Sequence, residues 1–115
     1  MHSIRVKKGD IIFTEGSFSD MVYIITSGRF ELSKVDSKGE KILIDVLGPN
    51  SIFGELGVLT GEPRTATVTA VEPGELSVLS PREFDHLLDK RPEFLRPLLR
   101  VMAKRLSEQN PLNFK

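Results

Sequence analysis

Regularly spaced turn signals divide the first two-thirds of this 115-residue chain and constrain its fold more than any other feature. Clusters of glycine, proline and small polar residues, which favour turns, recur from Lys8-Gly9-Asp10 to Glu72-Pro73-Gly74. Short runs rich in Ile, Val, Phe and Leu lie between them, and such runs predict strands. Short strands at this spacing are typical of a sandwich or a jelly-roll barrel, so we predict a mainly β fold over about residues 4–79. The expected strands are 4–6, 11–13, 22–26, 29–35, 41–47, 65–71 and 75–79.

The pattern changes after residue 80. Ser80-Pro81 is typical of a helix start, with a capping serine followed by a proline in the first turn. Apolar residues at helical spacing then predict one helix over 81–89 and a second from about Pro92, which Pro111 should end. We therefore expect a single domain over residues 1–115, with C-terminal helices over about 81–110. The apolar stripe of the second helix consists of Leu95, Leu98, Leu99, Met102 and Leu106.

The charge balance and the absence of cysteine exclude several classes of protein. The chain has 16 Lys and Arg residues and 16 Asp and Glu residues, so its net charge is zero. A zero net charge gives no general attraction to nucleic acid or acidic membranes. Without cysteine there is no disulfide and no thiolate metal site. No apolar run approaches the ~20 residues of a bilayer span, and the N-terminal residues MHSIRVKKGD lack the apolar stretch of a secretory signal. We expect a cytoplasmic protein, or the cytoplasmic part of a larger one, with no direct nucleic-acid contact and no membrane segment.

One segment, FGELGVLTGEPRTATV at residues 53–68, fits neither a plain strand nor an ordinary hairpin. Gly54 and Gly57 let the main chain approach a bound group closely. A short helical turn would direct free N–H groups toward an anion, and Arg64 could pair with a phosphate through two parallel hydrogen bonds. Glu55 could accept hydrogen bonds from sugar hydroxyls. Together these residues predict a site for a ligand with one phosphate and one ribose edge.

At these residues the chain resembles the cyclic nucleotide-binding domain family. The phosphate-binding cassette of that family has the pattern FGEL, a few residues, a short turn and then R-(T/S/A)-A-(T/S)-V, and every part is present here. The stretches KKGDIIFTEG, YIITSGRFEL and LGPNSIFGEL, and the predicted helix over 91–106, also resemble the family at matching positions. The resemblance implies a jelly-roll β-barrel with a short cassette helix and C-terminal helices. It also implies cAMP or cGMP as a regulatory ligand, with no metal.

The resemblance implies roles for individual residues around the sugar and the phosphate. Glu55 would accept a hydrogen bond from the ribose 2′-hydroxyl, and Gly54 would lie beside the ribose. The N–H of Gly57 would bind a phosphate oxygen, while Arg64 would neutralise the phosphate charge. Thr65 would offer its N–H and its hydroxyl to the same phosphate.

Further residues follow from the same resemblance. Ala66 would allow close main-chain contact, and Leu56 belongs to the FGEL part of the cassette. Apolar strand residues would line the pocket for the base, although the same residues could equally be plain core. Arg105 lies near the position from which relatives reach the purine, but it could also be an exposed helix residue. The expected residues of the base pocket are Leu32, Ile44, Leu47 and Val68.

The function implied is a cyclic nucleotide sensor in which a C-terminal helix closes over the bound base, with cAMP expected and cGMP possible. A homodimer, or a larger protein that carries the effector, would be its partner. The alternative is a domain of the same fold that only contacts other proteins. We expect no enzymatic activity, because His2 and His86 are the only histidines for a metal site and no Walker-type Lys-Ser/Thr ending follows the glycines.

Overall fold

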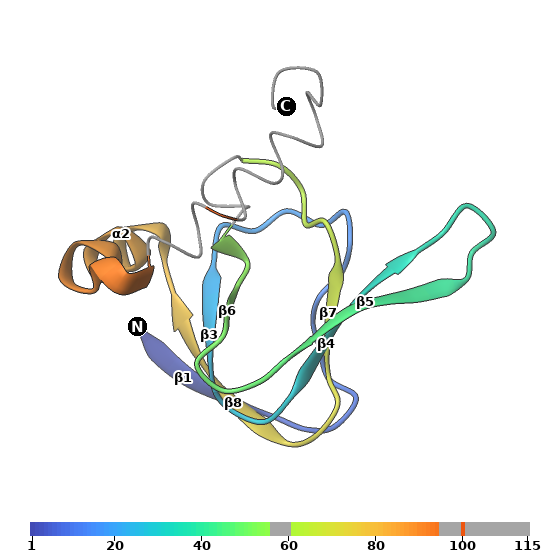
Figure 1. Cartoon of the computed structure of the whole chain (residues 1–115), viewed down its shortest axis with the longest axis horizontal. Helices are drawn as coiled ribbons and strands as arrows, with labels where there is room; N and C mark the ends of the chain where they lie inside the picture. The colour runs from blue at the N-terminus through green and yellow to red at the C-terminus, as the bar shows by residue number, and fades with distance from the viewer. Residues whose placement is uncertain (56–60, 95–99, 101–115) are drawn as a thin grey trace. The chain divides into compact units, whose positions relative to one another are not determined.

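The computed structural model describes residues 1–55, 61–94 and 100. The chain divides into two compact units, Met1–Pro81 and Arg82–Lys115 (Figure 1). The first unit contains the strands, and the described part of the second contains a helix and a 3₁₀ turn. This division falls where the sequence pattern changes from strand-like to helical spacing, next to the predicted helix start at Ser80-Pro81. That the two units form one domain over residues 1–115 remains a prediction.

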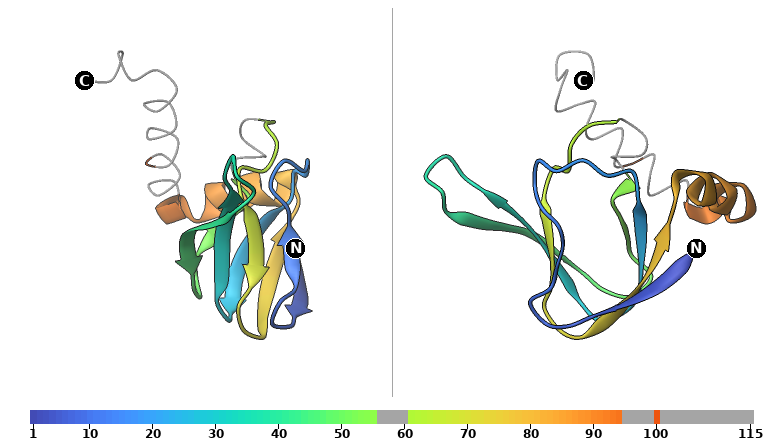
Figure 2. Two further views of the ribbon diagram at one scale, coloured as in Figure 1. Left: turned by 90° about the vertical axis from the view of Figure 1, so that its right-hand side faces the viewer. Right: turned by 180° about the vertical axis from the view of Figure 1, so that it is seen from behind.

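The first unit consists of two antiparallel four-stranded sheets that face each other (Figures 1 and 2). One sheet has the strand order β1-β8-β3-β6 and the other has the order β2-β7-β4-β5. Because strands that are distant in sequence lie side by side in both sheets, this is the jelly-roll arrangement that the turn spacing predicts. The strands are β1 (His2–Val6), β2 (Ile11–Phe13), β3 (Val22–Ser27), β4 (Phe30–Val35), β5 (Lys41–Leu47), β6 (Ile52–Phe53), β7 (Thr67–Ala70) and β8 (Gly74–Leu79).

Two features of the strand pattern differ from the sequence prediction. The strand expected over 65–71 is shorter, Thr67–Ala70. Just before it, the main chain of Arg64 is paired with Gly16 and Ser17 of the loop after β2. The sequence prediction also missed β6, which pairs with β3 over only two residues and is too short for a period-two pattern to reveal. The remaining strands lie where the sequence predicts them: 11–13 and 41–47 have the predicted bounds, and the ends of the others differ by at most two residues.

The core lies between the two sheets. Its side chains come from alternate positions of strands in both sheets, as Val68 and Ala70 of β7 illustrate. Each apolar side chain removed from water in this way contributes roughly 1.5–3 kcal/mol relative to an exposed one. The buried cluster consists of Val6, Ile25, Phe30, Phe53, Val68, Ala70 and Leu76.

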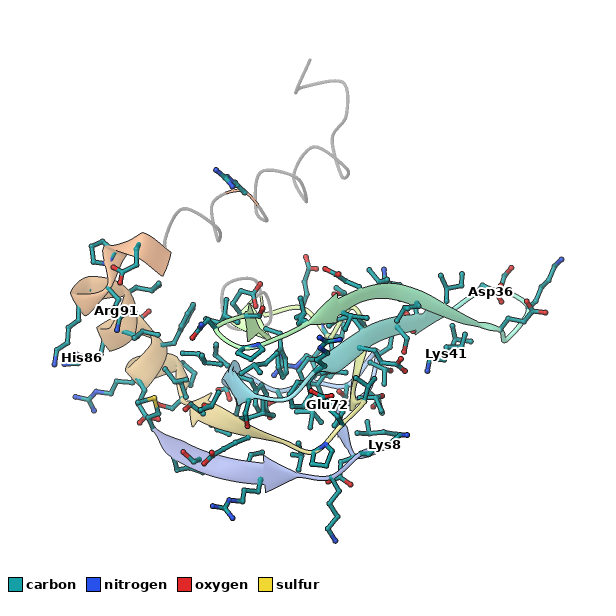
Figure 3. The ribbon with its side chains drawn as sticks, turned by 60° about the horizontal axis from the view of Figure 1, so that its bottom comes forward. Lys8, Asp36, Lys41, Glu72, His86 and Arg91 are labelled. Carbon is teal, nitrogen blue, oxygen red and sulfur yellow. The ribbon has the colours of Figure 1, made fainter. Side chains whose placement is uncertain are left out.

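The hairpin of β4 and β5 extends beyond the rest of the first unit (Figure 2). β5 is one of the two edge strands of its sheet. Because the hairpin extends beyond the opposite sheet (Figure 2), side chains on both faces of β5 are exposed until Leu47 packs against the core. Asp36 stands near the tip of this hairpin, where its Oδ1 accepts hydrogen bonds from the N–H groups of Lys38 and Glu40 at 2.9 Å each (Figure 3). Further along, Lys41 forms an ion pair with Glu31 of β4.

The described part of the second unit begins with α2 (Pro81–Lys90), followed by the 3₁₀ turn Pro92–Phe94. The helix start at Pro81 is confirmed, and the helix runs one residue beyond the predicted 81–89. Phe84 is its fully buried residue. The predicted apolar stripe from Leu95 to Leu106 lies outside the described residues. Within the described part of the chain, no helix is both long and apolar enough to cross a membrane.

Candidate functional site

Arg64 is fixed first through its main chain. It lies between Pro63 and β7, where its N–H donates to the carbonyl of Ser17 at 2.8 Å. Its own carbonyl accepts from the N–H of Gly16, also at 2.8 Å. Gly16 has a φ of +85°, a left-handed conformation that glycine adopts without steric penalty. This pair of hydrogen bonds places the Cα of Arg64 beside the loop that connects β2 to β3.

The side chain of Arg64 is buried, with only 4% of its surface exposed. Its Nη1 donates to the carbonyl of Gly54 and its Nη2 donates to the carbonyl of Met21, both at 2.7 Å. The guanidinium carbon lies 4.2 Å from the centre of the Phe13 ring. The positive charge therefore rests on two main-chain carbonyls and one aromatic face, none of which carries a negative charge.

One donor of this guanidinium has no partner. The Nε of Arg64 is buried, and it makes no hydrogen bond within the described residues. Burial lowers the pKa of Arg64, while the nearby acidic groups Tyr23, Glu55 and Asp20 oppose that shift. Because an arginine side chain stays charged in proteins, the site holds a buried cation with an unused donor. Such an arrangement fits an anion, and a phosphate could accept hydrogen bonds from the guanidinium as a pair.

Gly54 brings the chain close to this arginine because it follows β6 in a conformation with a φ of +86°. A Cβ at this position would stand 3.0 Å from Nη1 of Arg64 and 3.0 Å from the carbonyl oxygen of Met21. Both distances are tighter than ordinary contact. A glycine is therefore required here for two separate reasons, the backbone conformation and the space for the guanidinium.

Glu55 is also buried, with 9% of its surface exposed. Burial raises the pKa of Glu55 above its ordinary value, whereas a hydrogen bond from its own main chain and the charge of Arg64 lower it. Because both side chains are buried, Glu55 and Arg64 do not form an ion pair on the protein surface. The guanidinium instead donates to main-chain carbonyls, so the carboxylate of Glu55 is not neutralised by a direct hydrogen bond from it.

The other predicted site residues occupy varied environments. Thr65 is exposed and Ala66 is buried, directly after the arginine. Leu32 of β4 pairs in register with Val68 of β7, and Val68 is fully buried. Leu47 packs against the core, whereas Ile44 on β5 keeps 49% of its surface exposed. Three predicted residues lie outside the described part of the chain: Leu56, Gly57 and Arg105. The cassette helix, of which Glu55 alone is described, also falls largely outside it.

Sequence analysis missed the residues that hold the arginine. Met21 contributes only a carbonyl, and every residue has one, so no sequence signal marks it. Glu15-Gly16-Ser17 has the residue types of an ordinary turn, and Phe13 is one apolar residue of the strand predicted over 11–13. That all three lie next to Arg64 follows only from the pairing of β2 with β7 and from the loop contacts.

A metal site has no support among the residues that can be described. Within residues 1–55, 61–94 and 100, no three His, Asp or Glu side chains gather in a way that could hold a metal ion. His2 and His86 are both exposed, one on β1 and the other on α2, where Figure 3 shows it.

The fold and the site together define a jelly-roll domain with a buried arginine whose Nε has no partner among the described residues. Comparison with known families identifies the cyclic nucleotide-binding domain over residues 3–91. The chain belongs to the cyclic nucleotide-binding domain family, as the cassette predicts.

Individual relatives agree with this assignment. The chain is 32% identical over 110 residues to a CRP-like cAMP-activated global transcriptional regulator of Mycobacterium tuberculosis, which covers 96% of this chain and 49% of the relative. The structure of the catabolite activator protein of Thermus thermophilus matches with a TM-score of 0.80 and 28% identity, over 95% of this chain and 51% of that one. The cAMP-bound EAL enzyme Bd1971 matches with a TM-score of 0.74 and 30% identity, over 94% of this chain and 29% of that one. The chain spans about half the length, or less, of the curated relatives it matches.

Proposed function

We propose that this chain is a sensor domain that binds cAMP, with cGMP as the alternative ligand. The observation that carries the proposal is the buried guanidinium of Arg64, whose Nε has no partner within the described residues. A cyclic phosphate would supply the missing negative charge and acceptor. The mycobacterial cAMP-activated regulator and the cAMP-bound EAL enzyme are among the similar proteins that are named for cAMP. The same EAL enzyme is also known in a cGMP-bound form, which supports keeping cGMP as a second ligand.

The roles of the contact residues follow from where their side chains lie. Arg64 would neutralise the phosphate, and the buried Glu55 would accept a hydrogen bond from the ribose 2′-hydroxyl. Thr65 would reach the phosphate from its exposed position. Leu32, Leu47 and Val68 would provide apolar contact for the base, with Ile44 at the exposed side of the same strands. The contributions of Leu56, Gly57 and Arg105 remain predictions from the family resemblance.

Isothermal titration calorimetry with cAMP and with cGMP tests this function. The wild-type chain should bind, and Arg64→Leu should bind more weakly by roughly two to four orders of magnitude, because two hydrogen bonds to a charged group contribute about 1.5–3 kcal/mol each. Arg29→Leu is the matched control, since Arg29 is exposed and lies outside the site. The control should bind like the wild type. Absence of binding heat with both nucleotides would favour the alternative, a protein-interaction domain without a nucleotide.

We also propose that the domain is regulatory and not enzymatic, and that the segment after Pro81 reports ligand binding by rearranging. A ligand shifts such an equilibrium only if it binds one conformation more tightly than the other. Hydrogen exchange measured with and without cAMP should therefore change within residues 82–110 as well as around residues 54–66. Changes confined to residues 54–66 would contradict this readout. A homodimer, or a larger protein that carries the effector, would then transmit the signal.

A further inference from the structure

Among the described residues, the Phe13 ring supports the Arg64 guanidinium in a different way from the two main-chain carbonyls. Phe13 ends β2, is half-buried, and has its ring centre 4.2 Å from the guanidinium carbon. That distance is within the range of a cation–π interaction. The ring is itself held in place, because its centre lies 5.9 Å from the ring of Tyr23 and 5.8 Å from the ring of Phe53. Phe13 therefore presents a fixed aromatic surface to the arginine.

The supports of the guanidinium act in different directions. The carbonyls of Gly54 and Met21 accept hydrogen bonds from Nη1 and Nη2, so they hold the guanidinium at its edge. The Phe13 ring covers one face and limits rotation out of that plane. With the edge and one face occupied, Nε is left as a buried donor without a partner within the described residues. The arginine is thus held in one orientation before any ligand binds.

We propose that Phe13 is a positioning residue for ligand binding: it holds the Arg64 guanidinium in the orientation that leaves Nε free for an anionic oxygen. The inference rests on the proposed function, since the anion is the cyclic phosphate. Arginine is a long and flexible side chain, and ordering it at the moment of binding would weaken affinity. If the competent orientation fell to between about a third and a tenth of the population, the apparent affinity would fall by about three- to tenfold.

The test compares three variants for cAMP affinity by calorimetry. Phe13→Leu removes the aromatic face but keeps an apolar side chain, and it should bind cAMP about three- to tenfold more weakly. Phe13→Tyr keeps the ring and should restore affinity to within about twofold of the wild type. Phe30→Leu is the matched control, because Phe30 contacts the same aromatic cluster through Phe53 but is a core residue of β4. It should lower stability while leaving cAMP affinity unchanged.

A spectroscopic measurement separates positioning from packing. The ¹H–¹⁵N NMR signal of the Arg64 Nε–H, assigned by its absence from the spectrum of Arg64→Lys, should be protected from exchange and shifted by the ring in the free wild-type protein. Phe13→Leu should lose this protection and shift, whereas Phe13→Tyr and Phe30→Leu should keep them. An unchanged signal in Phe13→Leu, or an equal loss of affinity in Phe13→Leu and Phe30→Leu, would overturn the inference. If the wild type binds neither nucleotide, the proposed function is wrong, and the Arg64 signal still decides whether Phe13 orients the guanidinium.

Discussion

Replacing Gly54 with alanine should reveal how closely the main chain and the arginine are fitted together. The left-handed conformation at φ +86° costs an L-residue about 1–2 kcal/mol. In addition, the new Cβ would stand 3.0 Å from both Nη1 of Arg64 and the carbonyl oxygen of Met21. If that contact displaces the guanidinium and breaks one hydrogen bond to a charged group, a further loss of about 1.5–3 kcal/mol follows. The total expected decrease in the free energy of unfolding is therefore about 2.5–5 kcal/mol.

Gly39→Ala provides the matched control for this substitution. Gly39 lies in the turn of the β4–β5 hairpin with a φ of +81°, and a Cβ there would meet nothing within 4 Å. It shares the backbone strain of Gly54 without the contact, so its loss should stay near 1–2 kcal/mol. Urea denaturation followed by circular dichroism measures both variants. If Gly54→Ala destabilises the chain no more than Gly39→Ala does, the guanidinium is not held against Gly54 and the argument for its placement fails.

Two further predictions concern the carboxylate of the site and the packing of the sheets. Because burial raises the pKa of Glu55 above its ordinary value of 4.5, the folded state binds more protons than the unfolded state between that value and the raised one. The extra proton on Glu55 therefore stabilises the folded state at low pH. This stabilisation is lost as the pH rises through the pKa of Glu55 in the folded state, and the free energy of unfolding falls by at most about 1.4 kcal/mol per pH unit. Glu55→Gln should therefore stabilise the chain more at pH 7 than at pH 5 in urea denaturation, and the opposite order would contradict the assigned direction. Gly74→Ala should destabilise the chain by about 2 kcal/mol or more, because its Cβ would lie 2.4 Å from the carbonyl oxygen of Ser27. A thermal denaturation midpoint equal to that of the wild type would contradict this prediction.

Much of the fold could be predicted from the sequence because it depends on local preferences. Turn residues fix where the chain reverses, and runs of apolar residues between turns fix where strands form. The start of α2 at Pro81 follows from a serine and a proline that favour only the first turn of a helix. β6 could not be predicted, because two residues give no periodic signal. It forms because β3 supplies a pairing partner.

At the candidate site, too, some properties of single residues could be predicted from the sequence and others could not. That Gly54, Glu55 and Arg64 belong to a candidate site could be predicted from the sequence, because a glycine, an acid and an arginine occur together in one short segment. Their burial could not, because burial depends on which strands lie alongside. The strand at 41–47 is a clear example: its apolar pattern resembles that of a core strand, yet it belongs to a hairpin that extends beyond the opposite sheet (Figure 2), which leaves Ile44 exposed.

The sequence by itself determined the chemistry of this protein, since it specifies a cation, a carboxylate and glycines at the spacing of a phosphate-binding cassette. Only the tertiary structure decided what surrounds the cation. Phe13, Met21 and Gly54 are far apart along the chain, and they meet at Arg64 because β2 pairs with β7 and β3 pairs with β6. The supporting groups are an apolar ring and two main-chain carbonyls, which have no distinctive residue signature. Their effect arises from position alone, and position is fixed by long-range strand pairing.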